Sequence, residues 1–126
     1  ILISKIIYIK KNKNKNFVIL DAAMNDLMRT ALYGAKHQII PSKKNKKITN
    51  KIFEFVGPIC ESTDKFLTTK KFQNIREGEL IIICDVGAYG MSLSSNYNVR
   101  TLPAEILVKN SKMQVIKSRQ KLSDII

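Results

Sequence analysis

Most apolar residues of this chain fall in short segments that are rich in Ile, Val and Phe and are bounded by turn residues. Such segments are typical of β-strands, because β-branched and aromatic side chains fit a pleated, half-buried surface. They cover residues 2–9, 17–21, 52–57, 80–84, 104–108 and 113–117. With 126 residues, of which 44% are hydrophobic, the chain can bury one core. The sequence therefore predicts a single mainly β domain, an antiparallel barrel or sandwich.

One segment, residues 24–33, departs from this pattern. Its apolar residues are spaced as on one face of a helix, and Gly34 follows as a typical C-terminal cap. The residues on this face are Met24, Leu27, Met28, Ala31 and Leu32. We expect one short helical segment here, a hairpin connection at residues 11–16 and a tight turn at Glu77 and Gly78.

The formal net charge of +12 raises the hypothesis of a basic β-barrel module that binds nucleic acid. Many of the lysines lie in two lysine–asparagine runs, residues 10–15 and 43–51, which contain neither an aromatic residue nor Arg. Bases stack on aromatic side chains, and Arg suits phosphate better than Lys does. We therefore favour solvent-exposed hairpin tips and expect no nucleic-acid partner; a gel shift at physiological salt would separate the two hypotheses.

Membrane, metal and disulfide roles find no support in the sequence. No segment reaches the roughly 18 uninterrupted apolar residues of a membrane span. His37 is the single histidine, and no group of residues has metal-ligand spacing. Two cysteines, Cys60 and Cys84, do not make a disulfide framework, and Cys84 ends an apolar run where we expect it to be buried. Reduced thiols fit a cytoplasmic location.

Two pairs of residues carry chemistry. A protonated thiol at Cys60 could donate a proton, and the neighbouring Glu61 carboxylate could bind an ammonium group; the alternative is a strand end entering a loop. Arg29 and Tyr33 are four residues apart, so a helix would place them on one face. Arg grips a carboxylate with two hydrogen bonds, although an ordinary surface Arg beside a half-buried Tyr has the same spacing.

A third candidate is Tyr89, in the sequence Gly87-Ala88-Tyr89-Gly90. Glycines on both sides would let a phenol and its backbone approach a ligand closely, but they also mark ordinary bulges and turns.

Four segments, in this order, resemble the C-terminal domain of the diaminopimelate decarboxylase family. They are FVILDAAMNDLMRTALYGAKHQIIP (17–41), FEFVGPICESTD (53–64), DVGAYGMSLSSNYNVR (85–100) and PAEILV (103–108). Members are fold-type III enzymes with a (β/α)8 barrel that holds pyridoxal 5'-phosphate on a lysine. The resemblance implies that residues 1–126 are the β domain of a longer protein and that the barrel is absent from this chain. The isolated chain is then expected to be inactive, and a remnant without catalytic function is an alternative.

The resemblance also implies a role for each candidate. Arg29, Tyr33 and Glu61 would bind the substrate, Cys60 would be the proton donor, and Tyr89 would contact both cofactor and substrate. Cys60 and Glu61 would enter the site of the partner subunit in a homodimer. The reaction would be the conversion of meso-2,6-diaminopimelate to L-lysine and CO2. Glu61 after the cysteine, with Met-Asn-Asp-Leu near Arg29, favours this substrate over that of the related ornithine decarboxylase, and an ornithine- or arginine-type decarboxylase is the alternative.

Overall fold

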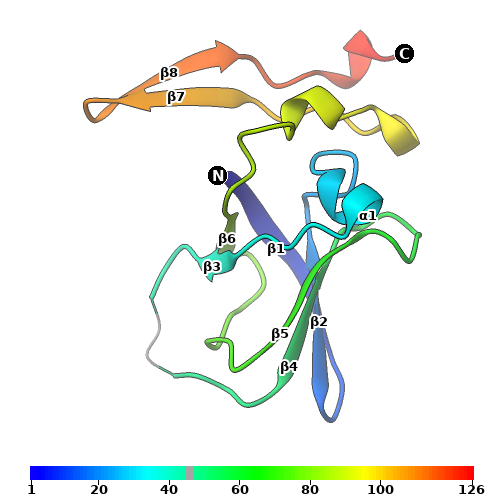
Figure 1. The fold of residues 1–126 in the computed structure, drawn as a ribbon, viewed down its shortest axis with the longest axis vertical. Helices are drawn as coiled ribbons and strands as arrows, with labels where there is room; N and C mark the ends of the chain where they lie inside the picture. Colours follow the sequence, from blue (N-terminus) through cyan, green and yellow to red (C-terminus); the bar gives the residue numbers. More distant parts are fainter. Residues whose placement is uncertain (45–46) are drawn as a thin grey trace.

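The protein is mainly β, as predicted, with one short α-helix among the residues that the structure describes (Figure 1). The computed structural model describes residues 1–44 and 47–126, so Asn45 and Lys46 of the second lysine–asparagine run lie outside the described residues. Six strands form one sheet in the order β3-β6-β1-β2-β4-β5. They are β1 (Leu2–Lys11), β2 (Lys15–Leu20), β3 (Ile39–Pro41), β4 (Ile52–Val56), β5 (Lys65–Lys70) and β6 (Leu80–Ile83).

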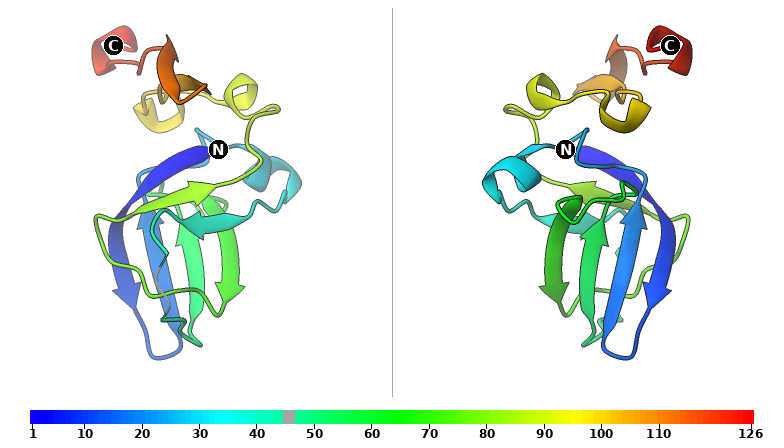
Figure 2. Two further views of the ribbon diagram at one scale, coloured as in Figure 1. Left: turned by 90° about the vertical axis from the view of Figure 1, so that its left-hand side faces the viewer. Right: turned by 90° about the vertical axis from the view of Figure 1, so that its right-hand side faces the viewer.

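The long first strand lets the sheet curl into a nearly closed barrel (Figure 2). The first part of β1 pairs with β6, through Leu2–Lys5, whereas its second part pairs with β2. A register shift between Ile6 and Tyr8 lies at the start of the second part, within its pairing with β2. Irregularities of this kind bend a strand and increase its twist, so one strand can serve two differently oriented portions of the sheet.

The pairing of β2 with β4 is parallel, with Val18 opposite Phe55, whereas the other strand pairs described are antiparallel. The antiparallel barrel predicted from the sequence is therefore correct except at this one pairing. A parallel pair needs a crossover rather than a hairpin, and residues 21–51 form that crossover. It contains the helix and β3.

The predicted strands are all present, and two further strands, β3 and β5, were not predicted. The predicted helix over residues 24–33 was too long, because α1 covers only Arg29–Tyr33. The residues before it form turns, since the Asp26 carboxylate accepts a hydrogen bond from the Ala23 amide at 2.9 Å. Gly34 ends α1 in the left-handed conformation, with φ 61°, as predicted for a C-terminal cap.

The core lies inside the curled sheet and alternates along the strands. In β2, Asn16, Val18 and Leu20 are buried and the residues between them are half-buried. Aromatic rings from β4 pack against Phe72, with the centroids of Phe55 and Phe72 5.0 Å apart. The expectation of a buried Cys84 was wrong. This cysteine is half-buried because it follows the last residue of β6, at the edge of the core.

The first lysine–asparagine run is not wholly a solvated tip. Lys10, Lys11 and Lys13 are exposed, but Lys15 forms an ion pair with the largely buried Glu54 and lies 4.5 Å from the centre of the Phe17 ring. Lys65 contacts the other carboxylate oxygen of Glu54 at 3.1 Å. Burial alone would raise the pKa of Glu54, but the hydrogen bonds from the two lysines outweigh it and lower this pKa below its usual 4.5.

The last third of the chain forms a separate layer above one end of the sheet (Figure 1). Its elements are the short 3-10 helices η1 (Met91–Leu93), η2 (Tyr97–Val99) and η3 (Leu122–Asp124) and the hairpin of β7 (Glu105–Lys109) and β8 (Lys112–Lys117). Apolar side chains of the hairpin, such as Val108 and Met113, are exposed. Within the described part of the chain, no helix is long and apolar enough to cross a membrane.

Candidate active site

The five residues predicted to carry chemistry lie on three segments near one end of the sheet. Arg29 and Tyr33 are in α1, Cys60 and Glu61 are in the loop of residues 57–64 between β4 and β5, and Tyr89 is in the turn after β6. The first two segments adjoin, since Ala31 of α1 packs on a buried cluster of Ala23, Met24 and Ile59. Among the described residues, no hydrogen bond or ion pair joins any two of the five.

The helix α1 presents its two candidate residues one turn apart, as their spacing predicts. Arg29 is the first residue of α1 and is half-buried, whereas Tyr33 is the last residue and is 67% exposed. Residues four apart lie on the same helical face. The Arg29 guanidinium and the Tyr33 phenol could therefore contact one ligand together.

The loop with Cys60 and Glu61 is held in place by a buried carboxylate, Asp64. One Asp64 oxygen accepts a hydrogen bond from the Ile59 amide at 2.8 Å, and the other accepts one from the Met24 amide at 2.7 Å. Burial raises the pKa of Asp64, although these two hydrogen bonds act to lower it. Asp64 thus ties the loop to the chain that leads into α1, and it was not predicted. Cys60 itself is an exposed free thiol.

Tyr89 occupies an uncommon backbone conformation. Its φ is 63°, and its side chain is 68% exposed. A bulky residue with positive φ is a strained feature that persists only when its surroundings impose it, and such residues gather at functional sites. The turn depends on Gly90, because a Cβ at that position would lie closer than 3.0 Å to the Val86 carbonyl oxygen. The turn therefore presents the Tyr89 phenol to the outside of the domain.

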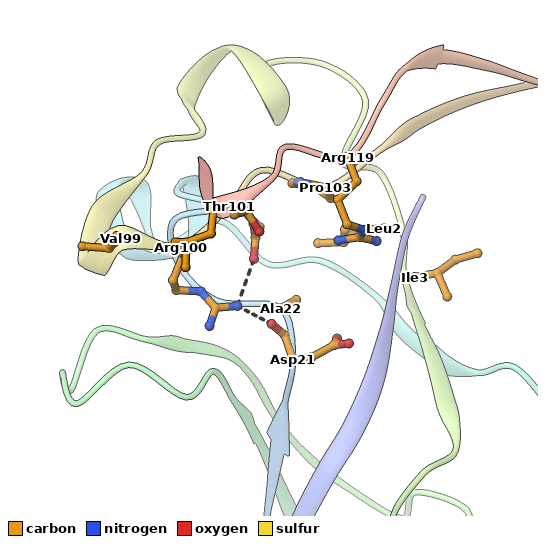
Figure 3. Close-up of a pocket in the computed structure, with 11 residues that line it drawn as sticks. Leu2, Ile3, Asp21, Ala22, Val99, Arg100, Thr101, Pro103 and Arg119 are labelled. Carbon is orange, nitrogen blue, oxygen red and sulfur yellow. Dashed lines mark hydrogen bonds and ion pairs between the residues drawn. The ribbon is translucent and has the colours of Figure 1, made fainter. Parts of the chain in front are cut away.

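A polar network that the sequence did not predict joins the sheet to the C-terminal layer. Arg100 donates from Nε to Asn25 Oδ1 at 2.9 Å. It also donates from Nη2 to the Asp21 carbonyl oxygen and faces Asp26 Oδ2 at 3.8 Å (Figure 3). Burial raises the pKa of Asp26, although the Ala23 amide and the charge of Arg100 act in the opposite direction. Arg100 thus joins the chain around Asp21 and Asn25 to the C-terminal layer.

Arg100 also lines a cavity of about 470 Å³ between the layers, which Figure 3 shows. None of the five candidate residues lines this cavity. Another cavity, of about 440 Å³, lies beside the candidates: Thr30 and Ala31 of α1 line it, together with Ser62 and Thr63 of the loop. The candidate residues are thus exposed or half-buried at the surface of the domain, and α1 and the loop with Cys60 and Glu61 lie next to each other.

One contact reaches a predicted residue from the C-terminal layer. The Tyr97 hydroxyl donates a hydrogen bond to Glu61 Oε1, with 3.1 Å between the oxygens. This hydrogen bond and the negative charge of Glu61 raise the pKa of Tyr97. Tyr97 was not predicted as a site residue, although its position between two asparagines in a turn-prone segment is a signal that could have indicated it. Among the described residues, no group of three or more His, Cys, Asp and Glu side chains could hold a metal ion.

A family model, curated relatives and solved structures all assign this chain to the same family. The family model described as "Pyridoxal-dependent decarboxylase, C-terminal sheet domain" matches residues 1–87. The diaminopimelate decarboxylase of Buchnera aphidicola subsp. Schizaphis graminum is 43% identical over 137 aligned positions, which cover 100% of this chain and 33% of that protein. The chain therefore spans about a third of the length of the curated relatives that it matches.

Solved structures agree in fold. Diaminopimelate decarboxylase from M. jannaschii superposes with a TM-score of 0.91 and 34% identity, over 98% of this chain and 28% of that one. The Helicobacter pylori enzyme, crystallised as a complex with L-lysine, gives a TM-score of 0.88 and 41% identity, over 98% of this chain and 30% of the other. Both similarities include the candidate residues and the C-terminal layer.

Proposed function

This chain belongs to the family of pyridoxal-dependent decarboxylases as their C-terminal sheet domain, and we propose that it forms that part of a diaminopimelate decarboxylase. Residues 1–126 are then the β domain of a longer protein, and the domain that carries the cofactor lysine lies elsewhere in it. The proposed reaction converts meso-2,6-diaminopimelate to L-lysine and CO2. The observation that carries this proposal is the 43% identity to such an enzyme over the whole chain.

The exposed groups of this domain fit a cofactor contact but not a cofactor cradle. Tyr89 offers a phenol from a strained turn at the surface, so it would lie against pyridoxal phosphate bound mainly by the other domain. When bound, this cofactor accepts the electron pair that departing CO2 leaves behind. The residues of this chain then have to orient the substrate and supply a proton.

Each candidate residue has a distinct task in this proposal. The Arg29 guanidinium binds a substrate carboxylate through paired hydrogen bonds, and the Tyr33 phenol, one turn along the same face, donates a further hydrogen bond. The Glu61 carboxylate binds an ammonium group. Cys60 Sγ holds a proton and transfers it to the carbon that has lost CO2, so that an S–H bond breaks and a C–H bond forms. The resulting thiolate regains a proton from water.

We further propose that the active site is completed by another chain in a homodimer. In support, the five residues are exposed or half-buried, and none of them lines either of the two cavities described above. Cys60 and Glu61 would project into the partner's site, and two-fold symmetry would produce two equivalent sites. A cytoplasmic location is proposed on the basis of the free thiols of Cys60 and Cys84.

The test is an assay of the complete protein that carries this chain, loaded with pyridoxal phosphate. We expect release of CO2 from meso-diaminopimelate with one equivalent of L-lysine formed. L-Ornithine and L-arginine serve as matched competitor substrates, for which we expect little turnover. Decarboxylation of either competitor in preference to meso-diaminopimelate would assign a different member of the family, and no decarboxylation of any of the three would contradict the proposal.

A further inference from the structure

We propose that Tyr97 is a positioning residue for Glu61 and thereby contributes to recognition of the substrate ammonium group. This inference rests on the proposed function, because it assigns Glu61 to substrate binding. Tyr97 lies 36 positions along the chain from Glu61 and belongs to η2 of the C-terminal layer, not to the loop that carries Glu61. The pairing therefore joins two layers of the molecule at the candidate site.

The contact with Tyr97 is the one that orients the Glu61 side chain. The Glu61 backbone amide is fixed by the Ile59 carbonyl oxygen at 2.8 Å, but its exposed carboxylate has no other hydrogen bond or ion pair within the described part of the chain. The phenol engages Oε1 at 3.1 Å and leaves Oε2 available. A carboxylate held by a neutral donor at one oxygen keeps its negative charge for an ammonium group at the other.

The segment around Tyr97 is unusually well fixed for an exposed turn. The Asn96 side-chain amide donates to the Arg100 carbonyl oxygen at 2.8 Å and to Gln120 Oε1 at 2.6 Å. Two residues that follow Tyr97, Asn98 and Val99, have φ of 56° and 57°. Positive φ is a genuine outlier for a β-branched residue and persists only where the surroundings impose it. This strain lies next to the side chain that reaches Glu61.

A Glu61 carboxylate that the Tyr97 hydroxyl has already oriented loses less entropy when it binds the substrate. An exposed glutamate loses rotamer freedom when it binds a ligand, whereas one that is already oriented has less to lose. Removing the Tyr97 hydroxyl should therefore weaken substrate binding without changing the chemical step. The phenylalanine ring of a Tyr97→Phe variant keeps the remaining packing, so this substitution isolates the hydrogen bond.

The pairing can be tested without any enzymatic activity. We would titrate the tyrosines of the complete protein by NMR, with Tyr97→Phe to assign the resonance of Tyr97. The pKa of Tyr97 should be above the usual value of 10.0 in the wild type and should fall in Glu61→Gln. Tyr8, which is 52% exposed on β1, serves as the control, and Glu61→Gln should leave its chemical shift unchanged. A Tyr97 pKa that is the same with and without the Glu61 charge would overturn the pairing, whatever the activity of the protein.

The positioning role is tested by a double-mutant cycle on the decarboxylase. Tyr97→Phe should raise KM for meso-diaminopimelate about fivefold, as expected for one hydrogen bond, with kcat changed less than about twofold. Tyr8→Phe should leave both constants unchanged. The double variant with Glu61→Gln should have no higher KM than Glu61→Gln alone, because both changes remove the same recognition. The positioning role would be overturned if the double variant raised KM by the product of the two single effects, or if Tyr97→Phe left KM unchanged. A protein without decarboxylase activity would instead refute the proposed function, and the titration would still decide the pairing.

Discussion

Gly57 lies directly against the carboxylate of Asp64: a Cβ at Gly57 would be closer than 3.0 Å to both Asp64 oxygens. The same carboxylate accepts hydrogen bonds from the backbone amides of Met24 and Ile59. Because Gly57 has no side chain, the Asp64 carboxylate fits against it at the other end of the loop. From there Asp64 holds the loop that carries Cys60 and Glu61.

We predict that Gly57→Ala lowers the free energy of unfolding by about 2 kcal/mol, the usual cost of inserting a methyl group into packed surroundings. The matched control is Gly87→Ala, since a Cβ there would have nothing within 4 Å. Urea unfolding would measure both variants, and the midpoint should shift only for Gly57→Ala. Equal midpoints would show that the Asp64 carboxylate can move aside at little cost.

Glu54 should make stability depend on pH in the acid range. Its pKa is lowered in the folded protein by Lys15 and Lys65, so its contribution is full above the unfolded value of about 4.5 and disappears as the pH falls through the folded value. We expect Glu54→Gln to cost about 1 kcal/mol near pH 7, because both lysines are partly exposed. The difference from wild type should vanish once the pH lies below the folded pKa of Glu54. A difference that is independent of pH would contradict the role of the charge.

Cys60 and Glu61 should differ in their kinetic effects in the complete enzyme. If Cys60 supplies the proton, Cys60→Ala should lower kcat by about 10²–10⁴-fold while substrate still binds. Glu61→Gln should mainly raise KM, because it weakens an ammonium contact. Steady-state kinetics would separate the two. A Cys60→Ala enzyme with full turnover would refute the proton donor, provided that protonation limits the rate in part.

A shared site predicts complementation between inactive subunits. A Cys60→Ala subunit and a subunit that lacks the cofactor lysine should each be inactive as homodimers. In a mixed dimer, one site collects both defects and the other collects none, so about half of the wild-type activity per dimer should return. Subunit exchange, monitored by native mass spectrometry, is the necessary control. Exchanged but inactive mixtures would place the whole site within one subunit.

Much of the fold follows from local sequence patterns, and the remainder from contacts between distant residues. The strands rich in Ile, Val and Phe were predictable because their side chains both favour extended backbone and fill the core. β5 was missed because its sequence, Lys-Phe-Leu-Thr-Thr-Lys, has only one fully buried residue, Phe66, and its two lysines and Thr68 are exposed. The start of the helix was misplaced because the side chain of Asp26 bonds the backbone three residues earlier and forms a turn.

The candidate site was predictable in its residues but not in its supports. Cys60 with Glu61 and Arg29 with Tyr33 are recognisable because each pair is close in sequence. The Tyr97 hydroxyl and the Glu61 carboxylate are brought together only by the tertiary structure, as are Asp64 and the Met24 amide. Local patterns contain no information about such pairs.

The parallel pairing of β2 with β4 has a consequence for how the domain folds. β1 and β2 are joined by a short turn, so contacts between them close a small loop. Contacts between β2 and β4 must close a much longer loop, which includes residues 21–51. The entropy lost on closure grows with loop length, and domains rich in distant contacts fold slowly. We therefore expect the hairpin to form ahead of the rest of the sheet. Substitutions at Ile9 should slow folding, and substitutions at Phe55 should mainly speed unfolding, which stopped-flow kinetics would reveal.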